Sequence, residues 1–469
     1  MESVFRELKS GGKLFVLCCT TLSLSHAVLL TLDGSLMGEL GTSGAMQLSD
    51  SLCNCALLLA VAAAFTWKPQ LIRLRWLLAF YLGSAAAGLA FALISRSGDM
   101  GALLFAASAL LTSSGCLSSL LARAGCVVVG EKLIAPCVVG SFLLGHVWNW
   151  LFSFLDTSGQ AAACLVVSLA VMLAACLYCQ PLFDRLQQSE PPAALNATRP
   201  SAFLPFGSQL FVYVTVFNFA HGYLLSFAST ASSGPGTAAT VIGLVAIGCI
   251  WMRFGSIFPD TLFSCSLLLV VGGFLLAPIA EVHSDIAAAL LAVGVACFNL
   301  VYLYTLLVIG AKNKVNTIPL LAWGACVEVA ALGLGQMIGT AVHTVFAAAP
   351  ATVSLVSAAI VLAILASVLF TLRSFSFEKT IRSTEDETTL TLAARAEQWQ
   401  ERCDAIADAA GLTPREREVF ALLAKGRNSP FIQKELVITN NTVKVHVRHI
   451  YQKLGVTGHQ ELIDLVDND

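Results

Sequence analysis

Long apolar segments alternate with short polar ones along the first 372 residues of the chain. A helix of about 20 apolar residues crosses the roughly 30 Å hydrocarbon core of a bilayer, and twelve segments of this kind can be drawn. We place them at 13–32, 48–66, 76–94, 101–121, 133–155, 161–179, 208–228, 238–252, 261–280, 286–309, 318–341 and 351–372. The pattern predicts that residues 1–372 form an all-α membrane domain of about twelve transmembrane helices.

The pattern becomes polar after residue 372. Residues 373–411 begin with charged and hydroxyl side chains, which are typical of a solvated linker, and then become helical in pattern. Small or apolar residues recur there at alternating steps of four and three, the spacing of a coiled-coil seam: Leu392, Ala396, Trp399, Cys403, Ile406 and Ala410. Two interpretations stay open, a short zipper between two copies or a face that packs against the C-terminal module.

Residues 412–469 carry four short helical patterns separated by capping signals. The first begins at Thr413, where T-x-x-E has the spacing of a capping box. The second begins at Ser429, which precedes a proline suited to the first helical position. The third begins at Thr439, and the fourth covers about 459–466. These signals predict a separate, water-soluble four-helix domain.

The third of these helices, about 440–454, separates apolar from basic side chains. Its predicted core positions recur at steps of four, three and four: Val443, Val447, Ile450 and Leu454. The opposite face has two basic side chains and no acidic one: Asn441, Lys444, Val445, Arg448 and Gln452. A helix fits the major groove of DNA, where Lys and Arg donate to guanine and Val touches a thymine methyl. A solvated basic face is the alternative interpretation.

Two segments of this domain, LTPREREV from Leu412 and TVKVHVRHIYQKLGV from Thr442, resemble the LuxR/NarL/FixJ-type helix-turn-helix. The resemblance covers residues 412–469. It implies that Lys444, Val445 and Arg448 face base edges in the major groove of double-stranded DNA. It also implies that Thr442 and His446 lie near the phosphate backbone and that the fourth helix forms a homodimer contact on DNA. Asn441, on the exposed face, is a further candidate for contact with DNA.

The membrane region divides into six plus six predicted spans. Its longest predicted cytoplasmic loop, 180–207, is rich in proline and follows the sixth span. This division resembles the major facilitator superfamily, whose two six-helix halves enclose a central cavity near the midplane of the membrane. The resemblance rests on architecture and implies a polytopic helix bundle.

Composition and charge agree with a membrane protein and give it an orientation. Hydrophobic residues make up 57% and charged residues 12% of the chain, and the mean hydropathy is +0.79, far from the values of soluble domains. Basic residues favour cytoplasmic loops. If the N-terminus is inside, the outside loops contain only Arg96, and the inside loops contain Lys68, Arg73, Arg75, Arg123, Lys132, Arg185, Arg199, Arg253, Lys312 and Lys314. We therefore expect both termini in the cytoplasm of a bacterial cell, at its inner membrane.

Polar residues within the predicted spans are candidates for binding a small molecule. Glu328 is the one carboxylate that we expect to be buried there, at a cost of about 2.5 to 3.5 kcal/mol on insertion scales. A ligand or proton site and a structural hydrogen bond between helices are equally good interpretations for it. The weaker candidates are His146, Asn149, Asn218, His221, Asn299 and Tyr302, for which interhelical contacts are the more common role.

No P-loop, kinase motif or metal-ligand cluster occurs in the chain, so we expect neither an enzyme nor a cofactor or metal site. The 15 cysteines fit small apolar packing positions better than a disulfide framework. We predict a membrane-bound one-component transcription regulator, in which the membrane domain senses an unknown small-molecule effector and the C-terminal domain binds promoter DNA. The alternatives are a transporter with a regulatory tail and a tail that docks another protein.

Overall fold

The structure is a computed structural model. It describes residues 2–31, 44–67, 73–95, 101–187, 209–225, 234–254, 258–276, 280–312, 314, 317–345, 355–356, 358–360, 362–363, 366, 376–383 and 399–467. This described part consists of helices and a few turns and contains no strand. The predicted all-α fold is therefore confirmed.

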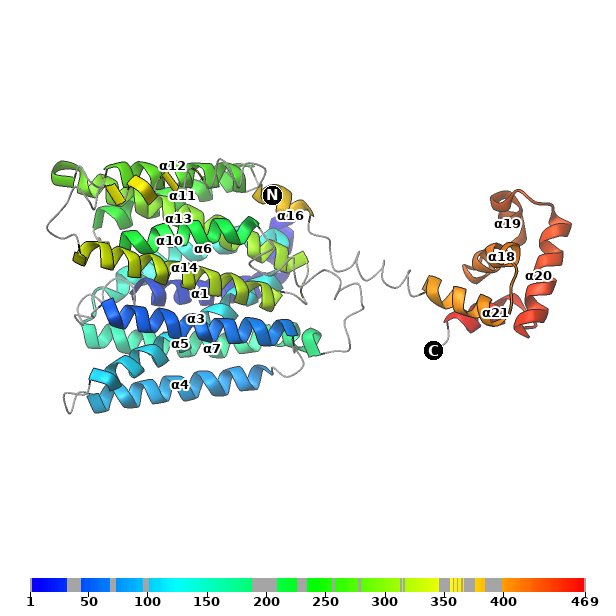
Figure 1. The fold of residues 1–469 in the computed structure, drawn as a ribbon, viewed down its shortest axis with the longest axis horizontal. Coiled ribbons are helices and arrows are strands. Elements are labelled where there is room, and N and C mark those ends of the chain that lie inside the picture. Colours follow the sequence, from blue (N-terminus) through cyan, green and yellow to red (C-terminus); the bar gives the residue numbers. More distant parts are fainter. Residues whose placement is uncertain are drawn as a thin grey trace. The chain divides into compact units, whose positions relative to one another are not determined.

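The membrane helices run side by side along a common direction (Figure 1). The first set is α1 (Glu2–Thr31), α3 (Gly44–Trp67), α4 (Leu74–Ser95), α5 (Gly101–Cys126), α6 (Glu131–Phe152) and α7 (Thr157–Gln187). The second set is α10 (Gln209–Leu225), α11 (Gly234–Phe254), α12 (Pro259–Leu276), α13 (Ala280–Lys312) and α14 (Thr317–Val345). We call these two sets the first half and the second half.

Each predicted span up to 318–341 coincides with one of these helices. The twelfth, 351–372, falls mostly outside the described residues, so the count of twelve stays a prediction. Within the described residues, nine helices are long and apolar enough to cross a membrane. The apolar stretch Asp50–Thr66, which lies within α3, is shorter. The chain is a multi-pass membrane protein.

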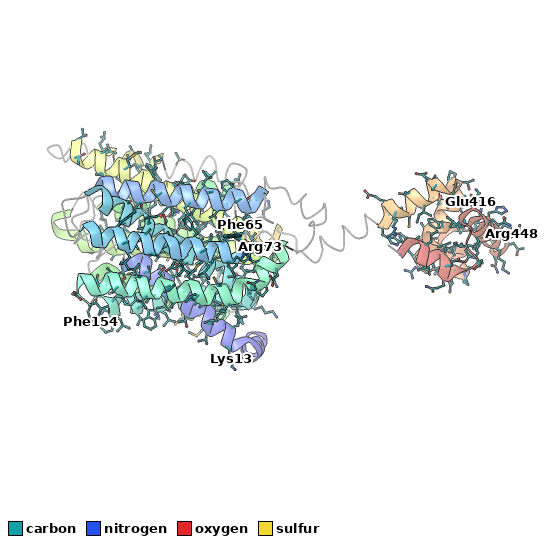
Figure 2. All side chains as sticks on the ribbon, turned by 90° about the horizontal axis from the view of Figure 1, so that it is seen from below. Lys13, Phe65, Arg73, Phe154, Glu416 and Arg448 are labelled. Atoms are coloured by element: carbon teal, nitrogen blue, oxygen red, sulfur yellow. The ribbon has the colours of Figure 1, made fainter. Side chains whose placement is uncertain are left out.

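The two halves pack against each other along α3 and α14 and along α6 and α11. An apolar and aromatic cluster extends through both halves. In the second half, for example, the rings of Phe217 and Phe298 stack with centroids 4.2 Å apart. Buried hydroxyl side chains such as those of Ser118, Ser141 and Thr305 also lie inside the bundle. Lys13 and Arg73 lie at one end of the bundle and Phe154 at the other (Figure 2), in agreement with the predicted alternation of loops.

A short helix, α16 (Phe377–Ser383), follows the membrane helices and packs on α12 and α13. It belongs to the same compact unit as the membrane helices. The described residues from 399 onward belong to a second compact unit with its own apolar core. We call this second unit the tail domain.

The tail domain contains α18 (Pro414–Ala424), α19 (Ser429–Leu436), α20 (Asn440–Leu454) and α21 (His459–Asp467). The Thr413 capping box and the Thr439 cap are present as predicted. The prediction for the second helix is wrong by one residue, because Asn428 accepts the hydrogen bond from the Phe431 N–H. Asn and Ser cap helices equally well, so the two neighbouring positions could not be separated in the sequence.

The predicted linker helix is present at residues 399–409. Cys403 and Ala407 are buried in the tail core, and Trp399, Ile406 and Ala410 pack against it. Of the two open interpretations, packing against the C-terminal module therefore describes this part of the seam. Leu392 and Ala396 lie outside the described residues.

Candidate functional site

The helix α20 owes its orientation in the tail domain to its apolar side. Val443 and Ile450 have no exposed surface, and Val447 and Leu454 pack against the same core. Thr439 Oγ1 accepts the Thr442 N–H at the start of the helix. The helix is thereby fixed at its first turn and along one face, which leaves the opposite face toward solvent.

That exposed face carries the residues predicted to read DNA. Asn441, Lys444, Val445 and Arg448 are all exposed, and Val445 keeps 42% of its surface. Arg448 lies at the outer edge of the tail domain (Figure 2). A shallow groove of about 540 Å³ runs beside Lys444 and Arg448, with Ser429 and Thr457 also on its walls. Two cations and a small apolar side chain are thus presented on one helix face.

The two residues predicted to lie near phosphates are placed differently. Thr442 is half-buried, and its hydroxyl hydrogen-bonds that of Thr439 over 2.8 Å, so it also takes part in the helix cap. His446 is half-buried on the flank of α20. The side-chain contacts that these two residues make to DNA stay predictions.

A buried carboxylate, Glu416, connects α20 to the start of α18. Its Oε2 accepts hydrogen bonds from the Thr413 N–H at 2.9 Å and from Lys453 Nζ at 2.6 Å. His449 Nδ1 lies 3.7 Å from the other oxygen. The hydrogen bond from Lys453, followed by the one from Thr413, lowers the pKa of Glu416 to about 2. The T-x-x-E spacing predicted the cap, but the contribution of Lys453 was missed.

In the membrane domain, Glu328 of α14 is paired with Arg123 of α5. The Arg123 guanidinium donates to Glu328 Oε2 over 2.9 Å, and the two side chains keep 17% and 21% of their surface exposed. The placement of Arg123 in a cytoplasmic loop was wrong, because α5 continues past the apolar window to Cys126. The ion pair joins the two halves of the bundle, and both side chains are mostly buried.

Two further helices of the second half bring polar groups to this ion pair. Tyr302 of α13 is 2% exposed and interacts electrostatically with Arg123 and Glu328. Its hydroxyl has no hydrogen-bond partner among the described residues. His221 of α10 interacts electrostatically with Glu328. Four helices therefore converge on one polar cluster, which we call the central cluster: Arg123, His221, Tyr302 and Glu328.

The other candidates do not join the central cluster in the same way. Asn218 donates to the Val214 carbonyl of its own helix, and Asn299 is half-buried on α13, one turn before Tyr302. Asn149 accepts a hydrogen bond from Thr31, an interhelical contact of the expected kind, and the His146 ring meets His26 edge to face.

Glu328 is not the only buried carboxylate of the membrane domain. Asp50, within the predicted span 48–66, is 6% exposed and accepts a hydrogen bond from Ser108 of α5. Its second oxygen has no partner among the described residues. Asn54, one turn along α3, accepts a hydrogen bond from Ser113. The expectation of a single buried carboxylate was therefore wrong. Asp50 lies inside the predicted span 48–66, so its burial could have been predicted from the sequence.

Comparison with known proteins gives a family for the tail. Residues 410–466 match the bacterial regulatory proteins of the luxR family. The chain is 44% identical over 52 residues to the spore germination protein GerE of Bacillus subtilis, covering 11% of this chain and 70% of GerE. It is 44% identical over 50 residues to the nitrate/nitrite response regulator protein NarL of Escherichia coli, covering 11% and 23%. In a putative mycobacterial regulator from Mycobacterium bovis, the match spans only 6% of that protein's length.

The membrane region is similar to solved transporter structures. The human organic anion transporter MFSD10 aligns with a TM-score of 0.50 at 13% identity, over 75% of this chain and 97% of that one. A bacterial homologue of the iron transporter ferroportin aligns with a TM-score of 0.52 at 15% identity, over 78% and 99%. At these identities the likeness shows the fold alone. Through residues 410–466 the chain belongs to the luxR family of bacterial regulatory proteins, and its membrane region has the fold of these two solved transporters.

Proposed function

We propose that this protein is a membrane-bound one-component transcription regulator. In this proposal the tail domain binds promoter DNA from the cytoplasmic face of a bacterial inner membrane, and the membrane domain senses a small molecule. The observation that carries the proposal is the exposed basic face of α20, within a segment that matches luxR-family regulators, in the same chain as a membrane helix bundle. The basic loop residues at one end of the bundle support the cytoplasmic placement.

The division of labour on α20 supports major-groove reading. Lys444 and Arg448 lie one helical turn apart on the exposed face, with Val445 beside them, so the three side chains can reach neighbouring base pairs. Thr442 and His446 then lie toward the phosphate backbone, where contacts position the helix without reading sequence, and Asn441 lies on the exposed face with Lys444. A homodimer formed through α21 would bind two half-sites, as is usual for helix-turn-helix proteins.

The central cluster is our candidate for the sensing site. An ion pair between two halves of a bundle is sensitive to their separation, since a desolvated charge without its partner is costly. A ligand that binds Arg123, Glu328, His221 or Tyr302 more tightly in one arrangement of the halves shifts the balance toward that arrangement. Asn218 and Asn299 lie on the same two helices as His221 and Tyr302 and are further candidates for contact with the ligand. The polarity of the cluster suits a small molecule that carries charged or hydrogen-bonding groups.

The test is genome-wide DNA occupancy of the full-length protein in bacterial cells. The wild-type chain should be enriched at a limited set of promoters, and the double variant Lys444→Ala with Arg448→Ala should lose that enrichment. Lys379→Ala on α16 removes one positive charge outside the tail domain and should leave the occupancy unchanged. If the wild-type chain occupies no sites, or if the double variant retains all of them, the proposal is rejected.

A transporter with a regulatory tail is the second candidate, and the shared fold of the membrane region favours it. Two measurements separate these candidates: uptake of a small molecule into lipid vesicles that contain the whole protein, and transcript levels in cells that contain the wild-type protein. If vesicles with the double α20 variant still take up the molecule, and transcripts in wild-type cells do not change with it, the membrane domain transports and does not signal to DNA.

A further inference from the structure

The short helix α16 is attached to the membrane domain by a buried aromatic residue. Phe377, its first residue, is 1% exposed. Its ring lies 5.2 Å from that of Phe263 in α12 and 6.1 Å from that of Tyr213 in α10, centroid to centroid. A phenylalanine buried in this way is a large apolar anchor. The start of α16 is therefore part of the core of the second half.

Both ends of α16 are also held by charged side chains of the second half. The Phe377 N–H donates to Asp260 Oδ1 over 2.6 Å, and Ser376 Oγ donates to the other oxygen of that carboxylate. At the other end, Lys312 Nζ donates to the Ile381 carbonyl over 2.8 Å. An anion at the N-terminus and a cation at the C-terminus match the helix dipole. These two residues, Asp260 at the start of α12 and Lys312 at the end of α13, fix the helix between them.

The helix that holds α16 also contacts the first half. α13 packs against both α16 and α6, and α6 belongs to the first half. A displacement of α6 relative to α13 therefore acts on a helix to which α16 is docked. The short helix is bound to the second half, and the first half reaches it through α13.

Because α16 is short, we expect it to be either docked and helical or released and no longer helical. It has seven residues, whereas an isolated helix shorter than about 12 to 15 residues is marginal in water. Its helical state thus depends on the contacts with Asp260, Lys312 and the aromatic cluster. Loss of docking and loss of helical structure are expected to be a single event.

We infer that α16 is a latch that couples the arrangement of the two membrane halves to the DNA-binding state of the tail domain. In the docked state residues 376–383 are fixed on the second half, and their release adds these residues to the chain that precedes the tail domain. This inference rests on the proposed function. Asp260, Lys312 and Phe377 act as positioning residues, because they hold the helix that precedes the tail and do not contact DNA themselves.

The experiment is hydrogen–deuterium exchange on the full-length protein in lipid nanodiscs, with and without sheared genomic duplex DNA. Coupling between two sites is reciprocal, so DNA binding must change the exchange of 377–383 if the latch exists. We expect DNA to slow the exchange of α20 and to alter that of α16 in the same sample. Slower exchange in α20 with unchanged exchange in α16 overturns the latch and leaves the proposed function intact. Unchanged exchange in α20 rejects the proposed function, and the latch with it.

Two variants test the anchor itself. Phe377→Ala and Asp260→Asn should each abolish the slow exchange of 377–383 without DNA, and should remove its response to DNA while α20 still responds. Lys379→Ala, at an exposed position of the same helix, controls for a change in helix propensity and should behave as wild type. If Phe377→Ala retains the response of α16 to DNA, docking of α16 is not the coupling step.

Discussion

Lys453 Nζ lies 2.6 Å from Glu416 Oε2, so the last turn of α20 is joined to the first turn of α18. Lys453 also donates to the Gly411 carbonyl, at the end of the linker helix. The same ammonium thus fixes α20 against both elements that lead into the domain. The orientation of the exposed face of α20 therefore depends on Lys453, which lies outside that face.

This pair predicts an acid-sensitive tail domain. The pKa of Glu416 is lowered to about 2 in the folded state by Lys453 and the Thr413 N–H, against about 4.3 in an unfolded chain. A lowered pKa stabilises the fold above the unfolded value, and this stabilisation is lost as the pH falls from about 5 to 2. We expect the loss to be about 1 kcal/mol, since Lys453 is partly exposed and screened. Urea unfolding of residues 387–469 at several pH values measures it.

Two substitutions separate Glu416 from the other carboxylates. Glu416→Gln should remove this part of the pH dependence and destabilise the domain at neutral pH. Glu418→Gln neutralises an exposed carboxylate on the same helix, paired with Arg415, and should preserve the pH dependence. Equal acid sensitivity in wild type and Glu416→Gln would show that other groups determine it.

A second prediction concerns Val437, in the turn between α19 and α20. It adopts a left-handed backbone conformation with φ of 53° and is 88% exposed. A β-branched residue is strained there, by roughly 1 to 2 kcal/mol, and has little burial to lose. Val437→Asn should stabilise the tail domain by about 1 kcal/mol, because Asn tolerates this conformation.

Gly426→Ala tests the opposite case. Gly426 has a φ of 70° and open space around it, so the added Cβ should destabilise the tail domain through backbone strain alone. Urea unfolding of both variants gives the signs.

A third prediction uses two cysteines at the contact between the halves. Cys55 of α3 and Cys326 of α14 have their sulfurs 3.9 Å apart, about 2 Å more than a disulfide requires. Mild oxidation of the protein in lipid should form this bridge, detected as a linked peptide by mass spectrometry. The exposed Cys53 and Cys249 report that the oxidant reaches the protein, and Cys326→Ser should abolish the linked peptide. Oxidation of the exposed thiols without a bridge would mean that α3 and α14 are not in contact there.

The tail domain could be predicted in detail from its sequence because its signals are local. Capping of α20 by Thr439 and the spacing of Val443 and Ile450 act within a few residues of one another, and the observed α20 has the predicted bounds. The family resemblance then supplied the predicted roles of Lys444 and Arg448, which stay predictions. The coarse fold of the membrane region was also accessible, because apolar length alone locates the spans.

The polar contacts of the membrane domain could not be predicted in the same way. Arg123 and Glu328 are separated by 205 positions, and no periodicity in one helix identifies a partner in another. Arg123 was assigned to a loop because the apolar window ended two residues before it. The anchoring of α16 by Asp260 and Lys312 likewise depends on tertiary packing. Asp50 is different: it was visible within a predicted span and was overlooked.

The last prediction concerns the Arg123–Glu328 ion pair and separates its structural role from sensing. Glu328→Met leaves a desolvated guanidinium without its partner, and Arg123→Met leaves a carboxylate, so each single variant should lose about 3 to 5 kcal/mol. Thermal unfolding in detergent measures this loss as a lower midpoint. The double variant removes both charges and should regain most of the stability, since apolar replacements of buried pairs are often neutral. Transcript profiles of the double variant then test sensing: a folded protein whose target genes no longer respond to growth conditions places the signal at this pair, whereas an unchanged response assigns the pair to packing. If the two single variants and the double variant are equally unstable, the two side chains are not coupled.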